Sequence, residues 1–357
     1  MFEVILLAVI CVFLAYLNSY KEFKYGLKIS FFLIFLFLAF RYNYGNDYMG
    51  YYQDFLDVNH YRKINYHDIA FHYEPGWLFL CRIFAPIGFF GMVMFLSLIN
   101  SVVYYRFISS YVPKKYYWLA VFIYICDPGF MLIQASAMRQ SLAICLFIVA
   151  IPYIFKKDFL RYSACILLGY LFHSSALILW PLYFLGFVNW KINKSAAILI
   201  FLLFVSLFLF GKYLMPFLNQ FILKNFERYE GYHASAEIGT GLGLIYSSVL
   251  FIVVLYFARF QVQEIALIFK IAIFSFMFIP LSFLIQIVGR IGMYFEPATL
   301  VAYPLLLKQI KKEYLKVIFL VSFLGFTGYT FFQFFHSDLW KEAFGTYHTI
   351  FTAPKID

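Results

Sequence analysis

Charged residues are scarce in this chain. Only 13% of its 357 residues are aspartate, glutamate, lysine or arginine, whereas a soluble protein carries about 25%. Hydrophobic residues make up 64% and the mean hydropathy is +0.81. Apolar runs of roughly 18 residues or more, the length that spans a bilayer, recur along the sequence. We therefore expect an all-α, polytopic integral membrane protein with about 12 transmembrane helices, rather than a soluble enzyme.

The patterns of several common chemistries are also missing. The five cysteines lie inside apolar stretches at unrelated spacings, so we expect packing residues and neither a disulfide framework nor a CxxC site. There is no HExxH, Asp-x-Asp, GxSxG or P-loop pattern. No metal and no cofactor is expected. No soluble domain or internal repeat is evident, so a single transmembrane domain is predicted over residues 1–357.

Basic residues are concentrated in alternate connections between the apolar runs, where only four acidic residues accompany them. By the positive-inside rule these connections are cytoplasmic. The net charge of +10 then reports topology and not nucleic-acid binding; an anionic soluble partner of these connections is the competing interpretation. The basic residues concerned are Lys21, Lys24, Lys28, Arg106, Lys114, Lys115, Lys156, Lys157, Arg161, Lys191, Lys194, Arg259, Lys270, Lys308, Lys311, Lys312 and Lys316.

The other connections are longer and chemically mixed. On this topology they face outward and contain most of the acidic residues and all seven histidines. Loops positioned by a rigid scaffold often carry function, so we expect the functional residues on this side. The outward connections are about 41–76, a short one around 127–138, about 215–242, and the tail 336–357.

The stretch FRYNYGNDYMGYY follows the second apolar run directly and combines Arg41, Asp47, two glycines and five tyrosines. Ionisable groups at the end of a span are costly unless they pair or meet a charged ligand. Arg41 and Asp47 are therefore candidates for a site. The alternative is a snorkelling Arg41 with a local ion pair to Asp47, and tyrosines that form an interfacial belt. Gly45 and Gly50 are candidates for tight turns.

Two further segments carry charge at the outward ends of helices. In HYEPGWLFL, Glu74 precedes Pro75 at an expected helix start, where a carboxylate also suits the helix dipole. In SAMRQSLAI, Arg139 and Gln140 open the fifth expected span. A cation is disfavoured at a helix N-terminus but becomes favourable if an anion such as a phosphate binds there.

His173 interrupts an apolar run of about thirty residues, too long for one span. The run predicts a hairpin that turns at His173-Ser174-Ser175 on the outward side. His173 is either a satisfied core histidine or a general base. Arg290 lies at another outward helix junction, followed by Tyr294. Arg228 lies in a predicted loop, where a solvated side chain is the simpler interpretation.

These motifs, taken in order, resemble the EpsG-type family of polysaccharide polymerases, Wzy-like enzymes of O-antigen, capsule and exopolysaccharide assembly. The motifs are Arg-x-x-x-Gly-x-Asp-Tyr from Arg41, Glu-Pro-Gly from Glu74, Met-Arg-Gln around Arg139, Phe-His-Ser-Ser-Ala around His173, and Gly-Arg with Tyr-Phe near 290. The resemblance covers nearly the whole chain. The tail departs from it, because Thr346 stands before Tyr347 where the family more often has proline.

The resemblance implies a bacterial cytoplasmic (inner) membrane protein, multi-pass, with its active site facing the periplasm or cell exterior. Its substrates would be undecaprenyl-pyrophosphate-linked oligosaccharides, as donor and as acceptor, with a chain-length regulator and a flippase as further partners. Arg139, Arg290 and Arg41 would bind the pyrophosphate leaving group. Asp47, His173 and Glu74 compete, in that order, for the general base.

Under the same resemblance Tyr48, Gln140, Tyr294 and Arg228 are expected to contact substrate. We further expect Arg139, Arg290, Asp47 and His173 to converge on one outward cavity. Two rival functions remain. A lipid-linked-glycan ligase, or another integral-membrane glycosyltransferase, would use the same kind of site. A precursor transporter is the second rival, although no acidic pair lies at mid-span as such a protein often requires.

Overall fold

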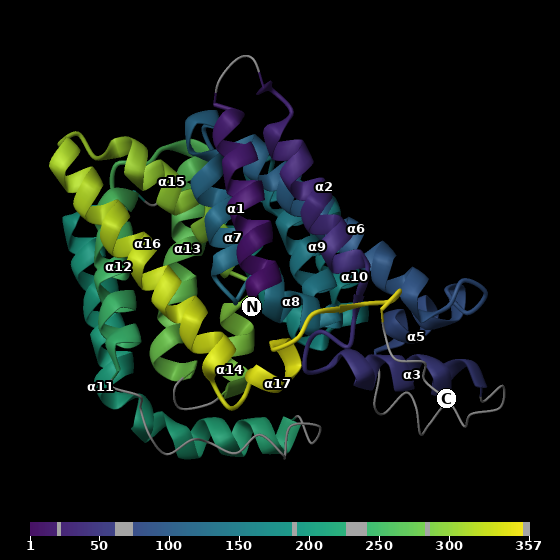
Figure 1. Cartoon of the computed structure of the whole chain (residues 1–357). Coiled ribbons are helices and arrows are strands. Elements are labelled where there is room, and N and C mark those ends of the chain that lie inside the picture. Colours follow the sequence, from purple (N-terminus) through teal and green to yellow (C-terminus); the bar gives the residue numbers. More distant parts are fainter. Residues whose placement is uncertain (20–22, 61–73, 188–190, 226–240, 283–285, 353–357) are drawn as a thin grey trace. The chain divides into compact units, whose positions relative to one another are not determined.

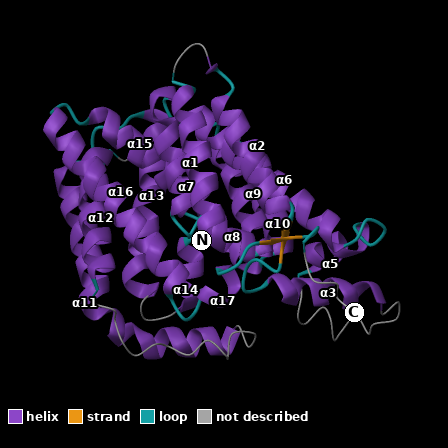
Figure 2. Ribbon diagram, viewed as in Figure 1, coloured by secondary structure: helices purple, strands orange, loops and turns teal. Residues whose placement is uncertain are grey.

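The computed structural model describes residues 1–19, 23–60, 74–187, 191–225, 241–282 and 286–352. Most of the described residues are helical (Figure 2), which confirms the all-α prediction. The strands in the described part are two short segments, β1 (Arg41–Tyr42) and β2 (His348–Thr349), which pair antiparallel. Both compact units of the chain are built mainly from helices.

The first compact unit comprises residues 1–183 and 310–357, and the second comprises residues 184–309. We describe each by itself, and a single transmembrane domain over the whole chain stays a prediction. The helices of unit 1 (Figure 1) are α1 (Phe2–Leu17), α2 (Gly26–Ala39), α3 (Tyr48–His60), α5 (Pro75–Ile83), α6 (Phe89–Tyr111), η2 (Lys114–Tyr116), α7 (Tyr117–Cys126), α8 (Met131–Ser136), α9 (Met138–Phe155), α10 (Phe159–Phe172), η3 (Ser174–Gly186, whose last residues belong to unit 2), α16 (Glu313–His336) and α17 (Lys341–Phe344).

Unit 2 is assembled around α13. This helix contacts α11, α12, α14, η5 and α15. Their bounds are α11 (Lys194–Asn225), α12 (Leu242–Ala258), α13 (Gln263–Ser282), α14 (Gln286–Gly292), η5 (Glu296–Ala298) and α15 (Thr299–Gln309).

Five helices of the described part are long and apolar enough to cross a membrane: Phe89–Tyr111, Met138–Phe155, Lys194–Gly211, Glu264–Ser282 and Glu313–His336. Five shorter apolar helices, of 10–17 residues, accompany them. Only 11% of Lys194–Gly211, and 17% of the most apolar 18-residue stretch of α16, is buried. These helices therefore expose apolar side chains on the protein surface, as a lipid-facing helix does. The total of about 12 spans stays a prediction.

The hairpin predicted at His173 is present. Helix α10 ends at Phe172 and η3 starts at Ser174. The two segments then run back along one another: the Tyr162 hydroxyl donates to the Leu179 carbonyl at 2.5 Å, and the Trp180 indole N–H donates to Ser163 Oγ at 2.9 Å. The long apolar run is therefore divided at the predicted place.

Segments that were predicted to face outward meet at one end of unit 1. The Gly45 N–H donates to the Ala343 carbonyl at 3.0 Å, and the Asp47 N–H donates to Ser136 Oγ at 3.2 Å. These bonds join the stretch after α2 to α8 and α17. The predicted connections 41–76, 127–138 and 336–357 thus contain short helices of their own, namely α3, α8 and α17. Part of the 215–242 connection lies outside the described residues.

Candidate functional site

Glu74 is positioned by the two residues that follow it. It is the N-cap of α5 in an extended conformation, and Pro75 occupies the first helical turn, where its missing N–H costs nothing. Helix α5 packs against α10. At Gly76 the contact is so close that a Cβ atom would lie 2.6 Å from the Leu171 carbonyl oxygen. The Glu-Pro-Gly sequence therefore brings Glu74 to the end of α10.

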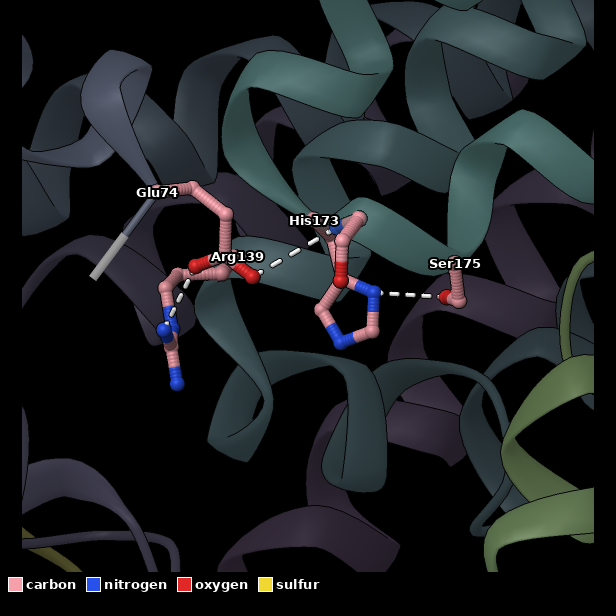
Figure 3. Close-up of polar contacts among 5 residues, drawn as sticks. Glu74, Arg139, His173 and Ser175 are labelled. Carbon is pink, nitrogen blue, oxygen red and sulfur yellow. Dashed lines mark hydrogen bonds and ion pairs between the residues drawn. The ribbon is translucent and has the colours of Figure 1, made fainter. Parts of the chain in front are cut away.

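Arg139 is the partner of Glu74. Its Nη1 atom lies 2.7 Å from Glu74 Oε2, and the side chains are 22% and 7% exposed, respectively. Arg139 is the second residue of α9, a position that disfavours a cation. The carboxylate of Glu74 offsets this cost. Figure 3 shows Glu74 reaching Arg139 with one oxygen and the backbone beside His173 with the other.

Tyr51 completes the surroundings of Arg139. The guanidinium carbon lies 5.6 Å from the centre of the Tyr51 ring, within the range of a cation–π contact. The same ring packs on Trp77 at 5.0 Å. Burial raises the pKa of the Tyr51 hydroxyl, so it is neutral near pH 7. Tyr51 could not be singled out from the sequence, because one tyrosine among five carries no distinguishing signal.

His173 lies directly beside this pair. It caps the C-terminus of α10 and is 8% exposed. Its Nδ1 lies 2.6 Å from Ser175 Oγ, which fixes the orientation of the ring. The next backbone N–H, that of Ser174, points to Glu74 Oε1 at 3.4 Å. The sequence predicted Ser175 as part of the turn but gave it no functional role. Its position two residues after a histidine is the signal that could have indicated one.

Asp47 lies one helical turn before Tyr51. Its side chain is exposed, and its carbonyl oxygen accepts the Tyr51 N–H at 2.9 Å. Gly45 makes the approach to this turn possible: its φ is +127°, and a Cβ atom would lie 3.0 Å from Ser136 Cβ. Gly50, by contrast, is an ordinary helical residue of α3 with nothing near its Cβ position, so the expectation of a tight turn there is wrong.

Arg41 does not share the partners of Arg139. It is 2% exposed, and its guanidinium donates to the Leu38 carbonyl, to Ser97 Oγ at 3.0 Å and to the Ala135 carbonyl at 3.0 Å. The alternative of a local ion pair with Asp47 is wrong, since Arg41 forms no ion pair among the described residues. Its role as a pyrophosphate ligand stays a prediction.

The expected substrate contacts occupy different positions. Tyr48 is fully buried and donates its hydroxyl to the Arg41 carbonyl at 3.0 Å; Gln140 is likewise buried, in α9. Arg290 in α14 and the buried Tyr294 belong to unit 2, so their convergence with Arg139 stays a prediction. Arg228 lies outside the described residues.

The described residues contain no group of three or more histidine, cysteine, aspartate or glutamate side chains that could hold a metal ion. The site brings together four groups at helix ends: the guanidinium of Arg139 on α9, the carboxylate of Glu74 before α5, the imidazole of His173 after α10, and the phenol of Tyr51 on α3. Such a set can bind an anionic leaving group and accept a proton from a hydroxyl.

The fold and this site define a polytopic helical membrane protein with a polar cluster at one end of its larger unit. The model of the EpsG family matches residues 24–348. The chain therefore belongs to the EpsG family, and the resemblance found from the motifs is confirmed. Membership supports a polysaccharide polymerase-type role at a membrane. No curated protein and no solved structure matches the chain.

Proposed function

We propose that this protein polymerises undecaprenyl-pyrophosphate-linked oligosaccharide repeat units into a surface polysaccharide, at the outer face of the bacterial cytoplasmic membrane. The observation that carries the proposal is the Glu74–Arg139 pair beside His173. It lies at the end of unit 1 where the stretches after Arg41, around Ser136 and around Ala343 meet. Membership of the EpsG family supports a polysaccharide polymerase-type role, and the undecaprenyl-pyrophosphate-linked substrate is part of the proposal.

The reaction transfers the growing chain from its lipid carrier to a hydroxyl of the next repeat unit. The bond from the anomeric carbon to the pyrophosphate oxygen breaks, and a bond to the acceptor oxygen forms. The hydroxyl proton passes to a base on the protein, and the pyrophosphate leaves with an additional negative charge. The site must therefore supply one positively charged donor and one proton acceptor.

Arg139 is the donor in this proposal. A guanidinium carries five N–H groups, so a phosphate can bind it while Nη1 keeps its contact with Glu74. Its 22% exposure leaves part of the side chain accessible to a ligand. Glu74 and Tyr51 then act as positioning residues, because they hold the guanidinium at the start of α9. Arg290 is the second proposed phosphate ligand.

His173 is the base that the geometry favours. Glu74 is engaged by Arg139 and by the Ser174 N–H, and such partners stabilise the carboxylate and weaken it as a base. Asp47 is exposed in a turn before α3. His173 combines an imidazole, which exchanges protons near neutral pH, with an orienting hydroxyl from Ser175.

The test is a reconstituted assay with purified protein, undecaprenyl-pyrophosphate-linked repeat units and size separation of the products. Arg139→Ala is expected to reduce the rate by about two to four orders of magnitude, and Arg139→Lys to restore only part of it, since lysine lacks the planar fork. Arg161→Ala is the matched control: Arg161 pairs with Asp158 at 3.5 Å but is 69% exposed, and its loss should leave the ladder intact.

The outcomes separate the rival functions. A ladder of products from wild type that Arg139→Ala abolishes, with the variant still monodisperse, supports the polymerase. A single transfer to lipid A or to a protein acceptor would favour the ligase. Movement of the lipid-linked unit across the vesicle membrane without a new glycosidic bond would favour a transporter, and either result would overturn the proposal. Addition of a chain-length regulator or a flippase would test those partners.

A further inference from the structure

A small, partly open cavity of about 20 Å³ lies within unit 1, between α2, α6, α8 and α9, and has both polar and apolar residues in its lining. Polar side chains of Arg41, Ser97, Asn100, Gln134 and Ser141 line it, and all five are buried. In a chain whose helices are otherwise mainly apolar, a cluster of this kind needs an explanation, because each buried polar group costs free energy unless it is paired. The cavity does not include Glu74, Arg139 or His173.

Arg41 brings a positive charge to this cavity. Three of its N–H groups are paired, with the Leu38 and Ala135 carbonyls and with Ser97 Oγ, whereas Nε is buried and has no hydrogen-bond partner among the described residues. No described carboxylate pairs with it. Burial lowers the pKa of Arg41 only to about 10, so the guanidinium is charged at neutral pH.

The two amides beside Arg41 are oriented as donors. The Tyr104 hydroxyl donates to Gln134 Oε1 at 2.8 Å, so the Gln134 Nε2 group is left buried without a partner in the described part of the chain. In the same way the Tyr124 hydroxyl donates to Asn100 Oδ1. The Asn100 Nδ2 group is turned to Ser141 Oγ at 3.0 Å. Both amide oxygens thus accept a hydrogen bond from a tyrosine hydroxyl.

A cation, unpaired N–H donors and the absence of a described carboxylate are the features of an anion site. The volume of about 20 Å³ gives a single small anion room between these side chains. The residues that line the cavity are different from those of the leaving-group site proposed around Arg139.

We propose that Arg41 and Gln134 hold a small monovalent anion, of the size of chloride, as a structural ligand between α2, α6, α8 and α9. The anion neutralises the guanidinium and accepts hydrogen bonds from the N–H groups of Arg41 Nε and Gln134 Nε2. Arg41 then joins the end of α2 to α8 through its carbonyl contacts. The proposal does not rest on the polymerase function, because its measurement is stability and not turnover.

The test compares thermal unfolding of the purified full-length protein in sodium chloride, sodium bromide and sodium gluconate at constant ionic strength. Chloride and bromide are expected to give a saturable rise in the midpoint temperature that gluconate, a far bulkier anion, does not give. Gln134→Leu removes a donor without removing the charge and should weaken the halide response severalfold. Arg161→Gln, an exposed arginine, should respond as wild type does.

A crystal or cryo-cooled sample soaked in bromide gives a direct readout on the wild type, by anomalous scattering at the cavity. A bromide peak within hydrogen-bond distance of Arg41 Nε and Gln134 Nε2 supports the proposal. Equal midpoints in chloride and gluconate, or a halide response that survives unchanged in Gln134→Leu, would overturn it. An ordered water at the same position with no halide dependence would overturn it as well.

Discussion

Replacing Gly76 by alanine tests how the site is assembled. The added Cβ would lie 2.6 Å from the Leu171 carbonyl oxygen, whereas an ordinary contact begins at 3.4 Å, so α5 and α10 must separate by roughly 0.8 Å. The Ser174 N–H already donates to Glu74 Oε1 over a long distance, 3.4 Å. A further displacement of α5 from α10 would break this hydrogen bond. The position of Glu74, and with it the Arg139 pair, therefore depends on Gly76.

The cost of such overpacking is about 1–3 kcal/mol, reduced by up to about 1 kcal/mol because alanine restricts the unfolded chain. We expect Gly76→Ala to be less stable than wild type by about 1–2 kcal/mol. Gly50→Ala is the matched control. Gly50 is helical with nothing within 4 Å of its Cβ position, so this change should stabilise the protein by about 0.5–1 kcal/mol.

The assay is thermal unfolding of both variants in the same detergent, with polymer formation measured in parallel. Gly76→Ala should unfold first and should lose most of the ladder. A Gly76→Ala protein that unfolds at or above the temperature of Gly50→Ala would refute the close approach of α5 to α10. Normal stability together with lost activity would place Gly76 in substrate contact instead.

Three other predictions concern polar side chains of unit 1. A double-mutant cycle of Glu74→Gln and Arg139→Met should give a coupling free energy of about 1–3 kcal/mol in unfolding, and a value near zero would contradict the ion pair. Ser175→Ala should lower turnover and shift the pH profile that reports His173, without changing the donor KM; an unchanged profile would mean that Ser175 does not orient the ring. Burial raises the pKa of Asp127 to about 6, above its unfolded value of about 3.9, so stability is lost as the pH rises between these values. Asp127→Asn should therefore raise the unfolding midpoint at pH 8 and not below about pH 4, which thermal scans at both pH values would check.

Local signals in the sequence were sufficient for the elements that carry the site. The apolar run around His173 exceeds the thickness of a bilayer, so its turn could be predicted. Pro75, and Arg139 with Gln140 ahead of an apolar run, likewise predicted helix starts, and α5 and α9 begin at these places. These features depend on residues within one or two helical turns of each other.

The pairing of side chains could not be predicted in this way. Glu74 and Arg139 are 65 residues apart, and the sequence shows two charges without showing that they meet. Tyr51 was hidden among five tyrosines that suggested an interfacial belt, whereas Tyr44 and Tyr48 are fully buried in the structure. Which tyrosine contacts a cation is decided by tertiary packing.

The stretch after α2 illustrates the same limit. A local pair of Arg41 with Asp47 was one of two interpretations of the sequence, but Gly45 and Ser136 turn the intervening chain so that the Asp47 side chain is exposed. Arg41 points to carbonyl oxygens of α2 and α8 instead. A positive φ at Gly45 thus separates two charges that are six residues apart.

The pairing of β1 with β2 has a consequence for how the protein is made. Arg41 pairs with Thr349 and Tyr42 with His348, and the Tyr347 hydroxyl donates to the Phe37 carbonyl at 2.7 Å across 310 residues of chain. During synthesis the N-terminal helices emerge and enter the bilayer long before these partners exist. The end of α2 therefore lacks its contacts with β2 and Tyr347 until the last helices have been inserted. A ribosome stalled late in translation would leave a chain with nearly all its helices and an unfinished site.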